Sequence, residues 1–348
     1  MQRIQSFDLA RGFTVLIMPS IHVVMLYSQP AVQQSVLGDI LGFIAEGPGA
    51  QLFMLLMGVS FVFSSRISKK YVLQRAFYLL LAAYSLNFLK FIVPLGLGLM
   101  PDNLLQELHL NNDFTAFSFF LLIGDILQFA AIAYIILFLV TRLKYYPYWA
   151  AAFAITILLL SPLVWDLKTG ITFVDRVLVL FNGHPPFTFF PVFPWLVYPL
   201  TGLTLGYLLK SNNATYILKK TGITGIILVI ISLLLPPTDQ PKEWLPFYRT
   251  APADTIFHLG FVLAWLAIYH WISRKVGKNP IFSLLEFCSR NITVIYLIQW
   301  VLIFWCLNLT GYLRLNMMNT FCWMTGITIV TLLLAHGLKK SNVQTKNI

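Results

Sequence analysis

The chain contains few charged residues. Of its 348 residues, 11% are Asp, Glu, Lys or Arg, whereas 58% are apolar. A soluble globular domain carries roughly 25% charged residues. So few charges cannot cover the surface of a soluble protein of this length, which excludes an ordinary soluble fold and indicates a lipid environment.

Cysteine is also scarce. Cys288, Cys306 and Cys322 are the only three, they lie in or beside apolar runs, and none belongs to a C-x-x-C pair. This pattern excludes a disulfide framework and a cysteine-based metal site, so we expect no metal.

Long apolar runs dominate the rest of the sequence. A bilayer core about 30 Å thick requires about 20 apolar residues in a helix that crosses it. Ten runs qualify, which predicts an all-α, polytopic membrane helix bundle of about ten transmembrane helices. The runs are Leu9–Ser28, Ala50–Ser65, Val72–Val93, Phe114–Val140, Tyr148–Val164, Phe190–Leu209, Thr221–Pro236, Thr255–Ile272, Ile292–Leu309 and Phe321–Leu338.

The apolar runs follow one another with short gaps. We therefore expect one integral-membrane domain over residues 1–340 and a short cytoplasmic tail over residues 341–348. The segment Pro30–Gly49 is expected on the outer side and is long for a connection between two helices. Ile171–Phe181 is apolar but too short to span, and is expected to lie at the interface or to re-enter.

The distribution of basic residues predicts the orientation. The net charge is +11, and the gaps on one side hold 18 Lys and Arg residues against 6 on the other. Cytoplasmic loops carry the excess of Lys and Arg. Both termini are therefore predicted to be cytoplasmic, and the positive charge does not indicate a nucleic-acid partner.

The first apolar run contains three ionisable residues, Asp8, Arg11 and His22. Such groups are costly in a bilayer and mark function by default. Arg11 and His22 are 11 residues apart, about three helical turns and about 16 Å, so they share one helix face. Asp8 can pair with Arg11. The alternative is that Arg11 only anchors the helix at the cytoplasmic side and His22 is a satisfied polar residue inside the bundle.

Two further polar pairs have helical spacing. Asp125 and Gln128 either line a substrate path or join neighbouring helices by hydrogen bonds. Asp254 and His258 would orient His22, receive an acceptor or form a local pair.

The first helix resembles that of the transmembrane acyltransferase superfamily, which carries a D-x-x-R-G segment followed by a histidine with Arg-x10-His spacing. Three later segments resemble, in the same order, the superfamily's second helix and then two segments of the branch of heparan-α-glucosaminide N-acetyltransferase-like and acyltransferase-3 proteins. The matching residues are Asp8, Arg11, Gly12 and His22; Phe53 and Gly58; Gly124, Leu127, Gln128 and Tyr134; and Pro194, Trp195, Gly202 and Gly206.

A segment near the end, SRNITVIYLIQW, resembles a G-R-N-S-L…Y-x-x-H segment of that branch. Ser289, Ile292 and Gln299 stand where the family segment has glycine, serine and histidine. We therefore assign no role to these three residues.

The resemblance implies that an acyl group, usually acetyl from acetyl-CoA, passes across the membrane to an acceptor, often a sugar amine or hydroxyl. It implies that His22 is the catalytic group, either as a general base or as a transient acyl carrier. Guanidinium groups suit phosphates, so the donor's phosphates are expected near the cytoplasmic groups Arg11, Asp8, Arg66, Arg290 and Asn291.

This interpretation predicts a protein of the cell membrane. Its expected partners are membrane lipid and a carbohydrate or glycoconjugate acceptor, and it leaves a homodimer open. Glu286 and Arg290, four residues apart, are expected to form an interfacial ion pair.

Two other functions compete: a secondary transporter or flippase, which also buries charges at mid-membrane, and a scaffold or receptor bundle without chemistry. We find no internal repeat of the kind common in transporters, and a scaffold leaves the shared face of Arg11 and His22 unexplained.

Overall fold

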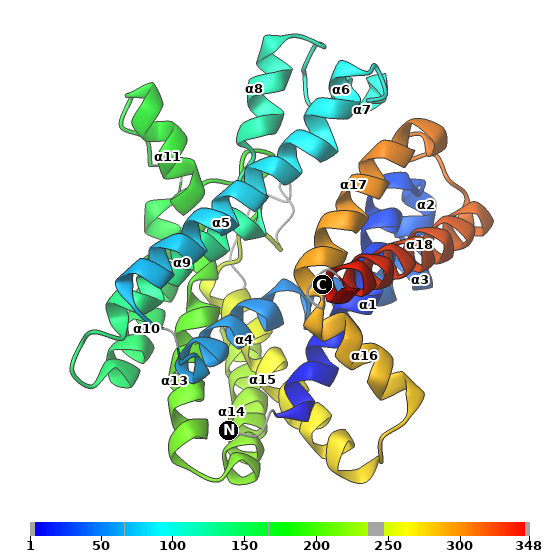
Figure 1. Ribbon diagram of the computed structural model, residues 1–348. Helices are drawn as coiled ribbons and strands as arrows, with labels where there is room; N and C mark the ends of the chain where they lie inside the picture. The colour runs from blue at the N-terminus through cyan, green and yellow to red at the C-terminus, as the bar shows by residue number, and fades with distance from the viewer. Residues whose placement is uncertain (1–3, 66, 166, 236–246, 345–348) are drawn as a thin grey trace. The chain divides into compact units, whose positions relative to one another are not determined.

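The computed structural model describes residues 4–65, 67–165, 167–235 and 247–344 (Figure 1). In these ranges every regular element is a helix, with only two isolated β-bridges besides. This confirms the all-α prediction.

The helices follow one another along the chain. Their bounds are α1 (Gln5–Tyr27), α2 (Pro30–Gln33), α3 (Val36–Glu46), α4 (Ala50–Phe63), α5 (Lys69–Asn87), the π-helix η1 (Phe88–Ile92), α6 (Val93–Gly96), α7 (Asp102–Glu107), α8 (Phe114–Leu122), α9 (Ile126–Val140), α10 (Tyr146–Val164), α11 (Thr172–Asn182), α12 (Val192–Trp195), α13 (Val197–Ser211), α14 (Ala214–Leu234), α15 (Pro252–Lys275), α16 (Pro280–Arg290), α17 (Ile292–Thr310) and α18 (Met317–Gln344).

Within the described ranges, nine helical segments are long and apolar enough to cross a membrane. The apolar helix α9 is shorter. The polytopic prediction is therefore confirmed. The nine segments are Gln5–Tyr27, Val36–Phe63, Lys69–Gly96, Tyr146–Val164, Val192–Ser211, Ala214–Leu234, Pro252–Lys275, Ile292–Thr310 and Met317–Lys340.

One predicted run differs from the structure, and two segments between the runs contain short helices. The prediction of one continuous run over Phe114–Val140 was wrong, because α8 ends at Leu122 and α9 begins only at Ile126. Pro30–Gly49, expected as an outer segment, contains α2 and α3, and its position relative to the membrane stays a prediction. Most of Ile171–Phe181 lies in the short helix α11, and whether this segment lies at the interface or re-enters the membrane stays a prediction.

The chain forms two compact units, each made of several separate stretches. Unit 1 comprises Met1–Ala45, Ser85–Leu121 and Val276–Ile348, and unit 2 comprises Glu46–Tyr84 and Leu122–Lys275. A single domain over residues 1–340 stays a prediction.

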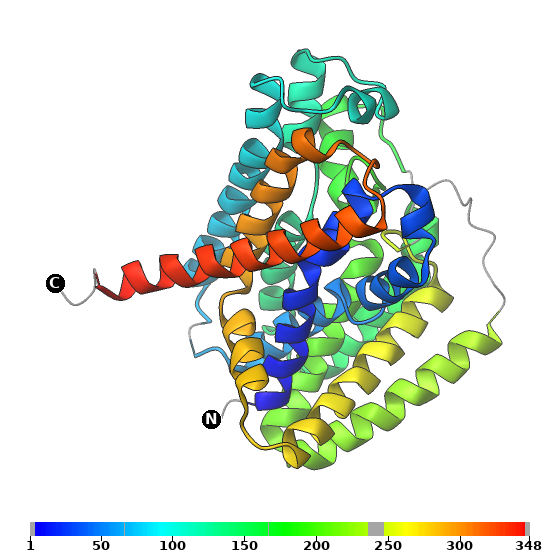
Figure 2. The same ribbon diagram turned by 90° about the vertical axis from the view of Figure 1, so that its right-hand side faces the viewer.

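In unit 1, α1 packs against α16, α17 and α18 (Figure 2). Gly12 permits the contact with α16, because a Cβ atom at this position would overlap the Leu285 carbonyl oxygen. Further along α1, the Tyr27 hydroxyl donates a hydrogen bond of 2.6 Å to the Ile303 carbonyl of α17. The first and the last helices of the chain are thus neighbours.

In unit 2, two helix pairs pack through glycines. Gly58 of α4 lies against the Pro199 carbonyl of α13, and Gly225 of α14 lies against Gly260 of α15. Small residues let helix backbones approach closely, which is a common way to hold membrane helices together.

Candidate functional site

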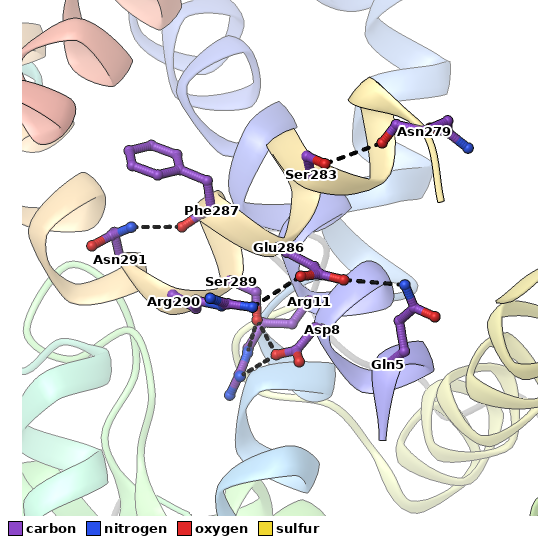
Figure 3. Close-up of polar contacts among 10 residues, drawn as sticks. All are labelled: Gln5, Asp8, Arg11, Asn279, Ser283, Glu286, Phe287, Ser289, Arg290 and Asn291. Atoms are coloured by element: carbon purple, nitrogen blue, oxygen red, sulfur yellow. Dashed lines mark hydrogen bonds and ion pairs between the residues drawn. The ribbon is translucent and has the colours of Figure 1, made fainter. Parts of the chain in front are cut away.

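A buried polar cluster joins α1 to α16 in unit 1 (Figure 3). Arg11 Nη2 lies 3.2 Å from Asp8 Oδ1, and Arg11 Nε donates a hydrogen bond of 2.9 Å to Ser289 Oγ. The Ser289 hydroxyl in turn donates to Asp8 Oδ1 at 2.7 Å. Asp8 and Ser289 are buried, whereas the Arg11 side chain is 24% exposed. The predicted Asp8–Arg11 pair is confirmed, and Ser289 is a third member that the sequence analysis missed.

A second polar chain lies beside the first on the same two helices. Gln5 Nε2 donates to Glu286 Oε1 at 3.1 Å, and Arg290 Nη2 donates to Glu286 Oε2 at 2.9 Å (Figure 3). The predicted Glu286–Arg290 ion pair is confirmed. The Arg290 side chain is 50% exposed, so the pair leaves part of its guanidinium accessible to solvent.

Asn291 marks the break between α16 and α17. Its Nδ2 donates to the Phe287 carbonyl at 2.8 Å, which binds one of the last carbonyls of α16. The residue before Ser289, Cys288, is fully buried, and burial raises the pKa of its thiol to about 11. This segment is therefore packed against the bundle.

His22 lies further along α1 and contacts α17. Its ring stacks on the indole of Trp300, with centroids 4.0 Å apart and planes 27° apart. Arg11 and His22 are thus both contacted by the last part of the chain, the first through α16 and the second through α17. This arrangement agrees with the prediction that the two residues share one face of α1.

Lys90, one of the six Lys and Arg residues counted on the outer side from the sequence, lies beside the same indole. Lys90 in η1 is 2% exposed, and its Nζ lies 4.8 Å from the Trp300 ring centroid and 4.6 Å from that of Phe91. The signal in the sequence was a single lysine inside the apolar stretch F-L-K-F-I.

Gln299 precedes Trp300 on α17 and is fully buried. Within the described ranges, neither its Nε2 nor its Oε1 has a hydrogen-bond partner. A buried amide without partners costs free energy, about 1–3 kcal/mol on protein mutational data. This position, to which we assigned no role from its sequence, is therefore chemically unusual.

Asp125 and Gln128, predicted to line a path or to join helices, form the N-terminal cap of α9. Asp125 Oδ1 accepts from the Ile126 amide at 2.7 Å, and Gln128 Oε1 accepts from the Asp125 amide at 3.0 Å. Gln128 Nε2 also donates to the Ile123 carbonyl at 3.1 Å. The capping box explains why the predicted run over Phe114–Val140 is interrupted. A role in a substrate path stays a prediction.

Asp254 and His258 lie on α15 in unit 2. Asp254 is exposed and His258 is half-buried. Within the described part of the chain, no hydrogen bond or ion pair joins the two side chains, and the His258 ring lies edge-on to Phe247, 6.5 Å between centroids. Their roles toward His22 and toward an acceptor stay predictions.

Two other predictions concern this site. Arg66 lies outside the described residues. The described ranges contain no group of three or more His, Cys, Asp or Glu residues that could hold a metal ion.

Residues 3–233 match the family model described as heparan-alpha-glucosaminide N-acetyltransferase, catalytic. The matched range includes the α1 residues Asp8, Arg11 and His22, as well as Lys90, and it ends before α16 and α17. No curated protein and no solved structure shows significant similarity to the chain.

Proposed function

Because the chain belongs to the heparan-α-glucosaminide N-acetyltransferase family, we propose that it moves an acetyl group from cytoplasmic acetyl-CoA to a sugar amine or hydroxyl on the other side of the cell membrane. The observation that carries this proposal is the arrangement on α1. One end of the shared face holds Arg11, and the other holds His22 stacked on Trp300. A donor bound at Arg11 can extend along this face toward the imidazole.

Arg11 would bind the phosphates of the donor. Asp8 and Ser289 hold its guanidinium in place, and its partial exposure leaves it accessible from the end of α1. Asp8 also offsets part of the positive charge of Arg11, so the half-exposed Arg290 would bind the donor's phosphates together with Arg11. Guanidinium groups recognise phosphate by two parallel hydrogen bonds.

His22 would handle the transferred group. As a general base it takes the proton of the acceptor amine or hydroxyl while that atom attacks the acyl carbon. As a nucleophile it forms a bond to the acyl carbon, the C–S bond breaks, and the acceptor then displaces the imidazole. In both routes coenzyme A leaves as the thiol after taking up a proton. Stacking on Trp300 limits the rotation of the imidazole and so keeps it oriented.

Acetyl transfer by membranes that contain His22→Ala tests this function. We expect a loss of at least 10²–10⁴-fold, the usual contribution of a general base, while expression and thermal midpoint stay near those of the wild type. The exposed His336→Ala is the matched control and should retain activity. Transfer by folded His22→Ala within a few-fold of the wild type would make His22 structural, and His258→Ala would then be the next variant to measure.

Donor affinity tests the other end of α1. Arg11→Gln should weaken acetyl-CoA binding by about 1.5–3 kcal/mol, the contribution of a charge-assisted contact, and affect acceptor binding less. The exposed Lys340→Gln serves as a control for loss of one positive charge. Equal donor affinity in Arg11→Gln and the wild type would favour the anchor role of Arg11.

A further inference from the structure

Lys90 lies inside an apolar helical segment, Lys69–Gly96, that is long enough to span the membrane. An ionisable residue in such a segment is costly and is retained mainly where it has a function. Lys90 also lies in the π-helix η1. Single π-turns inside longer helices occur frequently at functional sites.

The contacts around η1 hold Lys90 against α17. Trp305 Nε1 donates a hydrogen bond of 2.8 Å to the carbonyl of Leu89, the residue before Lys90. On the other side of Lys90, the ring of Phe91 packs edge-on against Phe304, with centroids 4.6 Å apart. The residues on both sides of Lys90 therefore contact α17.

The Trp300 indole contacts both His22 and Lys90. The imidazole stacks on it at 4.0 Å, and Lys90 Nζ lies 4.8 Å from its centroid. The residue before Trp300 on α17 is Gln299, whose buried amide has no hydrogen-bond partner in the described ranges. Lys90 thus shares the Trp300 indole with the residue that would handle the acyl group, and a buried, unpartnered amide directly precedes that tryptophan on α17.

We propose that Lys90 and Gln299 bind the carbonyl oxygen of the acyl group during transfer. This inference rests on the proposed function and adds two catalytic residues to it. When the nucleophile bonds to the acyl carbon, the π electrons of the C=O bond move to the oxygen, and the resulting negative charge is stabilised by the Lys90 ammonium and the Gln299 N–H. The C=O bond re-forms as the C–S bond breaks, and the charge passes to the departing sulfur. Such donors are strongest in a site that excludes water.

Turnover of Lys90→Met tests the first residue. Met keeps the length and removes the charge, so we expect kcat to fall about 10²–10³-fold, the usual effect of losing one oxyanion donor. Lys90→Arg should restore part of the lost rate. The exposed Lys168→Met is the matched control. Wild-type kcat in folded Lys90→Met would overturn the inference.

Stability distinguishes a catalytic Gln299 from a structural one. Gln299→Leu removes a buried amide that has no partner, so we expect a higher thermal midpoint together with a kcat at least 10-fold lower. A structural role predicts the opposite change in the midpoint. A lower midpoint, or an unchanged kcat, would overturn the role of Gln299.

Binding of paired donor analogues separates this inference from the proposed function. The wild type should bind S-acetonyl-CoA, which has a carbonyl, more tightly than S-propyl-CoA, which has none, and Lys90→Met should abolish this preference. Loss of transfer in His22→Ala with normal transfer in Lys90→Met would refute only the inference. A wild type that transfers no acetyl group to any sugar amine or hydroxyl would refute the proposed function itself.

Discussion

Gly12 of α1 packs directly against the backbone of Leu285 of α16, so closely that any side-chain carbon at position 12 would overlap the Leu285 carbonyl. The contact lies one residue from Arg11 and one helical turn from Ser289. It therefore sets the spacing at which the Asp8–Arg11–Ser289 cluster can form.

We expect Gly12→Ala to destabilise the protein, because the neighbouring atoms are backbone and cannot move aside. Overpacking of this kind costs about 1–3 kcal/mol or more. Gly42→Ala in α3 is the matched control, since no atom lies within 4 Å of a Cβ there. Thermal midpoints in detergent should fall for Gly12→Ala and hold or rise for Gly42→Ala. Equal midpoints would contradict the close packing of α1 and α16.

Ser289→Ala should weaken the polar cluster, because the substitution removes one hydrogen bond to Asp8 and one to Arg11. Leaving a buried partner unsatisfied costs about 1–3 kcal/mol. Ser283→Ala on the same helix is the control, since its hydroxyl only donates to the Asn279 carbonyl at an exposed position. Donor affinity and thermal midpoint should both fall for Ser289→Ala alone. If both variants behave alike, Ser289 does not support the cluster.

Asp125→Ala should destabilise the N-terminus of α9 by about 1 kcal/mol, the usual effect of losing an N-cap. Asp125→Asn should retain stability, because asparagine caps helices as well as aspartate does. The thermal midpoints of the two variants test the cap. Acetyl transfer adds a second result: a folded Asp125→Asn variant with low activity would support the predicted substrate path, and full activity would leave the residue as a cap only.

The free energy of unfolding should fall at alkaline pH because the buried Cys288 thiol resists ionisation in the folded state. Burial raises the pKa of this thiol from 9.0 to about 11, so the folded state keeps the proton more strongly than the unfolded state. The stabilisation is full below about pH 9 and is lost as the pH rises toward 11. Thermal midpoints between pH 8 and 11 should decline less steeply in Cys288→Ala than in the wild type. Parallel declines would show that this thiol does not contribute.

Accessibility reporters test the predicted orientation. Reporters near Lys144 and after Lys275, as well as at the C-terminus, should read as cytoplasmic because the basic residues concentrate there. Reporters in residues 97–101 and 311–316 should read as non-cytoplasmic. A C-terminus on the outer side would overturn the orientation.

The sequence by itself determined the class of the protein and the identity of the α1 residues. Low charge and long apolar runs permit only a membrane bundle, because each run must bury its backbone polar groups within one helix. The spacing of Asp8, Arg11 and His22 is a local property of a helix, and it was sufficient to place them on one face. The family resemblance carried by these residues agrees with the match over residues 3–233.

Only the tertiary structure decided which residues complete the site. Ser289 contacts Asp8 and Arg11 from 281 and 278 residues away. Helical periodicity relates only residues of the same helix, so it cannot predict this contact. Lys90 looked like an outer basic residue until the π-helix and the Trp305–Leu89 hydrogen bond placed it beside Trp300. The capping box at Asp125 likewise interrupted a run that hydropathy alone predicts as continuous. Hydropathy reports how much apolar surface a segment has, whereas packing between distant segments decides where each polar group finds its partners.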